Sequence, residues 1–185
     1  MTAPDDPAWV GEVLGFWFGE LSGSDWWAKS ESIDASIRTR FLCLHERLAS
    51  TDASGINRPR PLLAAVIVLD QFSRHLFRGS PRAFAADQIA RRLARQAVSQ
   101  GFDTIMRPEE QLFLYLPFEH SEDRADQAFA VNLIATLGQE AWTCSALAHQ
   151  TIIDRFGRFP HRNAVLGRES TSEELAALQE PMSSF

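Results

Sequence analysis

Apolar residues recur at intervals of three or four along this chain, and nowhere do apolar and polar residues alternate over a sustained stretch. The clearest case is the run Ile33, Ile37, Phe41, Leu44 and Leu48, whose spacing places these side chains on one face of an α-helix. A half-buried β-strand would need alternation, because its successive side chains point to opposite faces of a sheet. The pattern therefore predicts an all-α fold.

Start and stop signals divide the rest of the chain into further helices. Proline or serine precedes several apolar stripes and glycine follows them, as at the ends of helices in general. Ser121, for example, is expected to cap a helix that buries Ala125, Ala128, Phe129, Leu133 and Leu137, and Phe84 is expected to be buried in the helix that begins at Pro81. The predicted helices span about residues 7–18, 33–48, 61–78, 81–100, 108–116, 122–137 and 140–155, and a last one begins at Ser170 or Thr171. About eight helices joined by short turns make mostly antiparallel neighbours, and residues 1–185 suit one domain.

The run Leu62–Leu69 is the longest purely apolar part of the sequence. Its length would also suit a buried strand, but alanine and leucine dilute its β-branched content and the polar residues that follow keep helical spacing. We therefore predict a central helix that its neighbours enclose on all sides. Asp70, Arg74 and Arg78 follow at intervals of four, so they share one face of that helix. Asp70 is expected to be at least half buried, where a carboxylate needs a partner. Its structural alternative to a role in a site is a pair with Arg74, to which Arg158 or Arg162 could be joined.

Charge and hydropathy exclude several classes of partner. A net charge of −6 argues against nucleic-acid binding, which normally requires a basic surface. The longest apolar run is far shorter than the roughly 20 residues that span a bilayer, and Met1–Asp6 is acidic where a signal peptide is basic. Cys43 and Cys144 are too far apart in sequence for a metal-type motif. We expect a cytoplasmic protein with no nucleic-acid or membrane partner.

Basic and aromatic residues gather in the segment Arg155–Arg168, RFGRFPHRNAVLGR. Its glycines and proline disfavour a surface helix, and its phenylalanines disfavour a flexible linker. We predict an ordered loop, held in place by Phe156 and Phe159, that presents guanidinium and imidazole groups. His161 is the best chemical candidate, because neighbouring arginines should keep its imidazole neutral and able to accept a proton near pH 7. Its alternative role is to cap a helix or to brace the loop.

A second polar group lies at a predicted turn between two helices. Glu119, His120 and Glu122 could hold an anion at a helix N-terminus, or a carboxylate could orient the imidazole. His149 shares the apolar face of Trp142, so we interpret it as a core histidine. The sequence contains no nucleotide-binding, redox, nucleophile or complete zinc motif, so we predict no cofactor and no metal.

Long blocks of this sequence resemble a known family. The segments VLGFWFG (13–19), LDQFSRHLFRGSPRAFAAD (69–87), YLPFEHSEDRADQ (115–127) and IIDRFGRFPHRNAVLGRESTSEE (152–174) are similar to the bacterial domain of unknown function 924 family. The resemblance spans nearly the whole chain. It implies an all-helical, tetratricopeptide-like superhelix of stacked helix pairs, and it implies no activity. Where the family pattern reads DQFPRN, this chain has Ser73 and His75, which counts against a catalytic role for His75.

These residues support three hypotheses about function. In the first, arginines clamp a small anionic ligand while histidines and carboxylates transfer protons in one aromatic-walled pocket. In the second, a concave face of stacked helix pairs binds an acidic peptide. In the third, the same residues form a structural polar core. The predicted catalytic residues are Asp70, Glu119, His120 and His161, and the predicted ligand-binding residues are Trp17, Arg74, Arg78, Arg158, Arg162 and Asn163.

Overall fold

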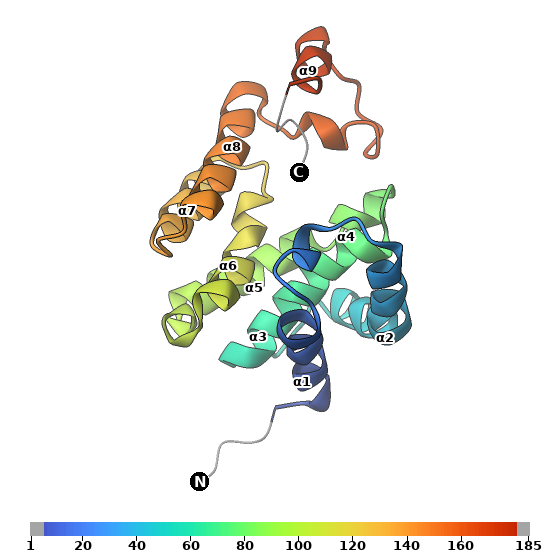
Figure 1. Ribbon diagram of the computed structural model, residues 1–185, viewed down its shortest axis with the longest axis vertical. Helices are drawn as coiled ribbons and strands as arrows, with labels where there is room; N and C mark the ends of the chain where they lie inside the picture. The colour runs from blue at the N-terminus through green and yellow to red at the C-terminus, as the bar shows by residue number, and fades with distance from the viewer. Residues whose placement is uncertain (1–5, 181–185) are drawn as a thin grey trace. The chain divides into compact units, whose positions relative to one another are not determined.

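The computed structural model describes residues 6–180, which contain helices and no β-strand (Figure 1). In chain order the α-helices are α1 (Ala8–Gly15), α2 (Glu31–Ser50), α3 (Pro59–Val66), α4 (Ser73–Leu76), α5 (Asp87–Ser99), α6 (Pro108–Glu119), α7 (Arg124–Ala135), α8 (Glu140–Phe156) and α9 (Ser172–Ala177). The all-α prediction is therefore confirmed. Residues 1–5, at the predicted acidic start, lie outside the described part. Within residues 6–180, no helix combines the length and the apolar character needed to cross a bilayer.

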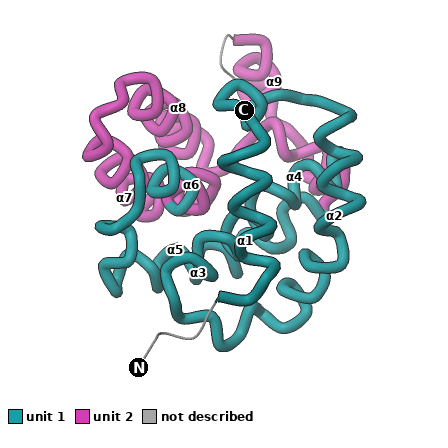
Figure 2. The backbone as a smooth tube through the Cα atoms, turned by 60° about the horizontal axis from the view of Figure 1, so that its bottom comes forward, with its two compact units in different colours: residues 1–78, 82–114 teal, residues 79–81, 115–185 magenta. Residues whose placement is uncertain are grey.

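The chain forms two compact units (Figure 2). Unit 1 consists of residues 1–78 and 82–114 and contains α1 to α5. Unit 2 consists of residues 79–81 and 115–185 and contains α7 to α9. Helix α6 begins in unit 1 and ends in unit 2. The prediction of one domain over residues 1–185 stays a prediction.

The centre of unit 1 is one long helix made of α3, the π-helical turn η3 (Ile67–Phe72) and α4. Every residue of Leu62–Leu69 is at most 2% exposed. The helix packs against α1 and α5 through α3, and against α2 and α5 through η3. Pro61 is tolerated near its start because the first N–H groups of a helix have no intrahelical acceptor. The prediction of an enclosed central helix is confirmed.

Two helices of unit 1 contain a π-helical turn, which the sequence does not signal. Helix α1 continues through η1 (Phe16–Glu20), so it passes Gly19, where the sequence predicts its end. The other turn, η3, contains Asp70. A π-turn changes the hydrogen-bond step of a helix and therefore the direction of the side chains that follow, and such turns are frequent at functional sites.

The segment before α5 differs from its prediction. The sequence predicts one helix over residues 81–100, but the structure has a 3₁₀ turn, η4 (Pro81–Phe84), followed by α5. Phe84, which we expected to be buried, is half-buried. The end of α5 is as predicted: Gly101 follows it with φ 69°, a left-handed conformation that glycine adopts without a steric penalty.

The core of unit 2 is the pair α7 and α8, which lie side by side (Figure 1). Helix α8 has the predicted extent and buries Ala146, His149 and Ile153 as predicted. Helix α7 uses a different face from the predicted one: it buries Asp126, Gln127, Ala130 and Ile134. The predicted buried face is the apolar stripe of Ala125, Ala128, Phe129, Leu133 and Leu137. This prediction is wrong because periodicity alone does not show which face of a helix meets a neighbour.

Pro117 does not end α6, contrary to the prediction. The helix continues to Glu119 with Pro117 inside it. An interior proline removes its own N–H from the hydrogen-bond ladder and its ring crowds the carbonyl four residues before, which weakens a helix but does not always end it. The next turn still closes, and the backbone N–H of His120 donates to the carbonyl of Leu116 at 2.8 Å. His120 therefore lies directly after the C-terminus of a helix.

Asp123, and not Ser121, caps α7. The carboxylate of Asp123 accepts the backbone N–H groups of Ala125 and Asp126 at 2.8 and 3.1 Å. The hydroxyl of Ser121 instead donates to the carboxylate of Asp126 at 2.8 Å. Both residue types are common helix caps, and the prediction of Ser121 as the cap is wrong.

Helix α9 begins as predicted, with a capping box. The hydroxyl of Thr171 accepts the backbone N–H of Glu174 at 3.2 Å, and the carboxylate of Glu174 accepts the backbone N–H of Thr171 at 2.7 Å. This reciprocal pair fixes the buried carboxylate of Glu174 at the end of the preceding loop.

We expect Asp123→Ala to lower the free energy of unfolding by about 1 kcal/mol, because it removes the acceptor of two N-terminal N–H groups of α7. Asp123→Asn should lose much less, since an amide oxygen can accept the same hydrogen bonds. Urea unfolding followed by circular dichroism measures both variants. Equal losses for alanine and asparagine would show that the cap does not stabilise the helix.

Candidate functional site

The residues predicted to form a site fall into two groups. Trp17, Asp70, Arg74 and Arg78 belong to unit 1, whereas Glu119, His120, Arg158, His161, Arg162 and Asn163 belong to unit 2. The prediction that both groups line one pocket stays a prediction. The contacts within each group nevertheless separate the residues by the chemistry they can perform.

Arg74 connects two carboxylates of unit 1. Its guanidinium donates two hydrogen bonds to Asp87, at 2.6 and 2.9 Å, and lies 3.7 Å from the carboxylate of Asp70. Asp70 is fully buried and accepts a further hydrogen bond of 2.6 Å from Gln71. Burial works to lower the pKa of Arg74, but Asp87 and Asp70 outweigh it and raise the pKa. The predicted contact of Arg74 with Asp70 is confirmed, and the closer partner, Asp87, is one that sequence reasoning missed.

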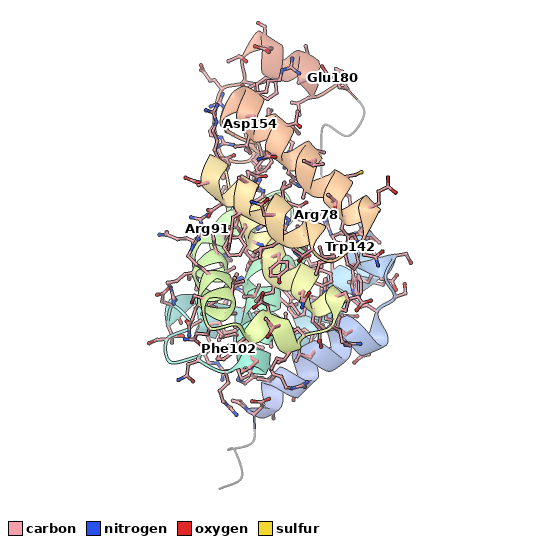
Figure 3. All side chains as sticks on the ribbon, turned by 90° about the vertical axis from the view of Figure 1, so that its left-hand side faces the viewer. Arg78, Arg91, Phe102, Trp142, Asp154 and Glu180 are labelled. Atoms are coloured by element: carbon pink, nitrogen blue, oxygen red, sulfur yellow. The ribbon has the colours of Figure 1, made fainter. Side chains whose placement is uncertain are left out.

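Arg78 and His75 share the carboxylate of Asp34 on α2. Arg78, labelled in Figure 3, donates through Nε and Nη2 at 3.0 and 2.9 Å, and Nδ1 of His75 lies 2.7 Å from the same carboxylate. Burial works to raise the pKa of Asp34, but the hydrogen bonds from Arg78 and His75 outweigh it and lower the pKa. Arg78, predicted to clamp an anion, therefore already binds a carboxylate of the protein.

Trp17 belongs to the aromatic core of unit 1. Its ring centroid lies 5.5 Å from that of Phe72, 5.3 Å from that of Phe113 and 6.1 Å from that of His75. The side chain is fully buried, and the indole Nε1 has no hydrogen-bond partner within residues 6–180. The predicted role of Trp17 as the wall of a ligand pocket stays a prediction.

Unit 2 contains an ordered loop where the sequence predicts one over Arg155–Arg168, but Arg155 and Phe156 still belong to α8 and the loop covers residues 157–171. Phe159 anchors the loop, since its side chain is fully buried. Phe156, the other predicted anchor, is only half-buried. The 3₁₀ turn η6 (Pro160–Arg162) follows Phe159 and carries His161. One aromatic anchor and one helical turn therefore position this histidine.

The outer arginines of the loop bind carboxylates of unit 2. Arg158 binds Glu174 through Nε and Nη2 at 2.6 and 2.9 Å, and its hydrogen bond lowers the pKa of Glu174 to about 2. Arg168 binds Glu122 at 2.7 and 2.9 Å. Burial works to raise the pKa of Glu122, but the hydrogen bond from Arg168 outweighs it and lowers the pKa. Two-point pairs of this kind hold the loop against α9 and against the turn before α7.

Glu119 and His149 form a buried acid–base pair, with 3% and 4% of each residue exposed. Nδ1 of His149 lies 2.9 Å from Oε1 of Glu119 and 2.9 Å from the carbonyl oxygen of Ser145. The hydroxyl of Ser145 donates to the same carboxylate oxygen at 3.0 Å. Because a carbonyl oxygen can only accept, Nδ1 carries the proton and Nε2 is the basic nitrogen of the neutral ring. The core position of His149 is as predicted, but sequence reasoning missed its pairing with Glu119.

Further imidazoles lie next to this pair. The rings of His149 and His161 pack against Phe159 with centroid distances of 5.6 and 5.5 Å, and the ring of His120 lies 6.3 Å from that of His149. The guanidinium of Arg162 lies 4.4 Å from the Phe159 ring and donates to the backbone carbonyl of His120 at 3.0 Å. The histidine cluster consists of Glu119, His120, His149, His161 and Arg162.

Two fully buried amides hold the backbone that carries the cluster. Gln127 donates to the carbonyl oxygens of Glu119 and Ser121, both at 2.6 Å, and so fixes the chain on either side of His120. Asn163 donates to the hydroxyl of Ser170 at 3.0 Å. The amide nitrogen of Asn163 therefore braces the loop, and its predicted contact with a ligand stays a prediction.

His161 is neutral at neutral pH. Burial, together with the charge of Arg162 and the neighbouring His149, lowers the pKa of His161 to about 4. The sequence predicts a neutral ring but attributes it to the arginines, whereas burial is the larger cause. A neutral imidazole offers one hydrogen-bond donor and one acceptor. His161 can therefore orient a polar ligand without adding charge.

The cluster combines groups that suit proton transfer next to a charged ligand. The Glu119–His149 pair can accept a proton, and Arg162 carries a permanent positive charge. Within residues 6–180, no group of three or more His, Cys, Asp or Glu side chains has an arrangement that could hold a metal ion.

Comparisons with known proteins give a family but no activity. A family described as a bacterial protein of unknown function (DUF924) matches residues 13–182, a range that includes both groups of predicted site residues. A solved structure, the protein of unknown function ATU0120 from Agrobacterium tumefaciens, is 36% identical and superposes with a TM-score of 0.89, covering 95% of this chain and 99% of that chain. No curated protein matches the chain.

We expect Arg74→Met to lower the free energy of unfolding by about 3 kcal/mol, because it removes the cation that Asp70 and Asp87 share. Arg78→Met is the matched control. The side chain of Arg78 is 42% exposed, whereas that of Arg74 is 22% exposed. We therefore expect Arg78→Met to lower the free energy of unfolding by only about 1 kcal/mol. Denaturant unfolding measures both variants, and a loss for Arg78→Met as large as that for Arg74→Met would contradict the ranking by burial.

The lowered pKa of His161 gives a pH-dependent stability. Between its pKa of about 4 in the folded protein and the ordinary value of 6.5, the unfolded chain binds a proton that the folded chain does not. Stability therefore falls as the pH drops from 6.5 towards 4. In the His161→Asn variant, we expect the free energy of unfolding to fall by about 2 kcal/mol less over this pH range, because asparagine stays neutral. Urea unfolding of both proteins at pH about 7 and about 4.5 tests this, and identical falls would refute it.

Proposed function

Because this chain belongs to DUF924, a bacterial family of unknown function, we propose its function from its own residues: unit 2 binds a small anionic ligand at the histidine cluster and exchanges a proton with it. The observation that carries the proposal is the buried Glu119–His149 pair with His120 beside it. A buried carboxylate and imidazole cost stability unless they are well paired.

The group that accepts the proton in this proposal is Nε2 of His149. Glu119 orients the ring through Nδ1 and stabilises the imidazolium that forms when Nε2 takes up a proton. Ser145 holds Glu119 with a hydrogen bond of 3.0 Å, so the carboxylate keeps its direction. A fixed carboxylate–imidazole pair of this kind is a common general base in enzymes.

Arg162 supplies the charge that favours an anionic ligand. Its guanidinium lies over the Phe159 ring and donates to the backbone of His120, so it is held close to the imidazoles of the cluster. A guanidinium fork binds a carboxylate or a phosphate with two parallel hydrogen bonds. His161, whose low pKa keeps it neutral, would orient the ligand by hydrogen bonding.

The other arginines predicted to hold the ligand favour a structural role. Each donates two hydrogen bonds to a carboxylate of its own unit, and the pairs are Arg74 with Asp87, Arg78 with Asp34 and Arg158 with Glu174. A guanidinium in a two-point pair must break it before it can bind a ligand. These contacts support the hypothesis of a structural polar core for Arg74, Arg78 and Arg158. In the proposal the ligand-binding arginine is Arg162, because it contacts His120 and Phe159 of the cluster.

The alternative is a tetratricopeptide-like module that binds an acidic peptide. Such a module needs exposed guanidinium groups along a groove. The two-point pairs of Arg74 and Arg158 do not favour it. We also propose a cytoplasmic location, as the sequence predicts.

Anion titration of the full-length chain tests the proposal. With inorganic phosphate or succinate as the probe, we expect the NMR signals of the His120, His149 and His161 imidazoles to shift. Arg162→Gln should weaken binding about tenfold, which corresponds to about 1.4 kcal/mol. Arg155→Gln is the charge-matched control, because Arg155 pairs with Glu173 at 3.1 Å outside the cluster. It should change the dissociation constant less than about twofold.

Two outcomes would reject the proposal. In one, neither anion moves the three imidazole signals. In the other, Arg155→Gln weakens binding as much as Arg162→Gln, which would indicate attraction to overall charge. The structural-core hypothesis has its own signature: Arg162→Ala would lower the melting temperature strongly while wild-type protein shows no response to either anion.

A further inference from the structure

Unit 1 contains a pocket of about 470 Å³ that none of the predicted site residues lines. The pocket is bordered by residues at the start of α1, by the last turn of α2 and by the loop of residues 51–58 that leads to α3. Trp9, Leu48, Ile56 and Pro61 supply its apolar lining. Its volume is in the range of sites that hold small organic molecules.

The charged residues that line this pocket are both basic. Arg58 binds the carboxylate of Asp6 at 2.9 Å. Arg47 is exposed in the last turn of α2 and makes no ion pair with any carboxylate of residues 6–180. Asn57 adds an amide, and no acidic residue lines the pocket. Because the charge of Arg58 is offset by Asp6, Arg47 is the group of this lining that attracts an anion, although the chain as a whole carries a net charge of −6.

The loop of residues 51–58 forms the rim of the pocket, and part of this rim has a costly backbone conformation. Asp52 and Ala53 have φ of 53° and 47°, left-handed values that are unfavourable for residues other than glycine. Helix α5 fixes the rim from outside. Arg92 donates to the carbonyl of Asp52 and pairs with its carboxylate at 2.9 Å, and Gln96 donates to the carbonyl of Ile56 at 3.1 Å. A rim that is ordered before binding reduces the entropy lost when a ligand enters.

We propose that this pocket binds a small organic anion with a flat apolar body. Arg47 meets the anionic group, and Trp9 and Ile56 contact the apolar body. We do not expect a bare inorganic ion to be the preferred ligand, because it would leave the apolar side chains of the lining without a contact. The pocket belongs to unit 1 and the histidine cluster to unit 2, so this site is independent of the proposed function.

Titration of the full-length chain with 2-naphthoate, followed by the backbone amide signals of residues 51–58, tests the inference. Naphthalene-2-carboxamide, which has the same ring and no charge, and inorganic phosphate, which has charge and no ring, are the ligand controls. We expect 2-naphthoate to bind with a dissociation constant below about 1 mM and to shift these signals, and each control to bind at least about tenfold more weakly.

Protein variants identify the groups that bind. Arg47→Gln should weaken 2-naphthoate binding at least about fivefold, whereas Lys29→Gln, which removes an exposed charge outside the pocket, should change it less than about twofold. The inference is overturned if 2-naphthoate does not bind, or if either ligand control binds as tightly. It is also overturned if Arg47→Gln has no more effect than Lys29→Gln, since Arg47 would then serve only to offset the dipole of α2.

Discussion

The cost of burying a charge without a partner governs the polar groups of both units. In unit 1, Arg74 lies between the fully buried Asp70 and the carboxylate of Asp87. In unit 2, the buried Glu174 meets Arg158 in a two-point pair. These pairs join the central helix to α5 and the loop to α9, so the contacts that satisfy the charges also fix which segments lie together.

The histidine cluster differs from these pairs in what it can do. An arginine–carboxylate pair does not change its protonation near neutral pH, whereas an imidazole can. The polar network around the cluster is also larger than a single ion pair requires, because Ser145 orients Glu119 and the buried Gln127 fixes the chain on both sides of His120. Natural proteins keep such buried polar networks at a cost in stability, most often where function requires a fixed geometry.

Sequence reasoning succeeded where local rules decide the structure. The apolar run Leu62–Leu69 is enclosed because it is apolar on every side, and Thr171 caps α9 because its capping box is a short-range pattern. It failed where two local signals compete, as with Ser121 and Asp123, and where no local signal exists, as with the π-turn that contains Asp70. For the polar groups it identified the basic member of a pair, such as Arg74 or Arg158, and missed its closest acidic partner.

By itself, the sequence determined the all-α class, the enclosed central helix and the ordered loop that carries His161, because periodicity, apolar content and glycine or proline positions act over a few residues. Only the tertiary structure decided that Glu119 meets His149, that Asp87 meets Arg74 and that α5 holds the rim of residues 51–58. These contacts join residues on different elements. They depend on which helix faces pack together, and many faces of similar polarity are compatible with the same local pattern.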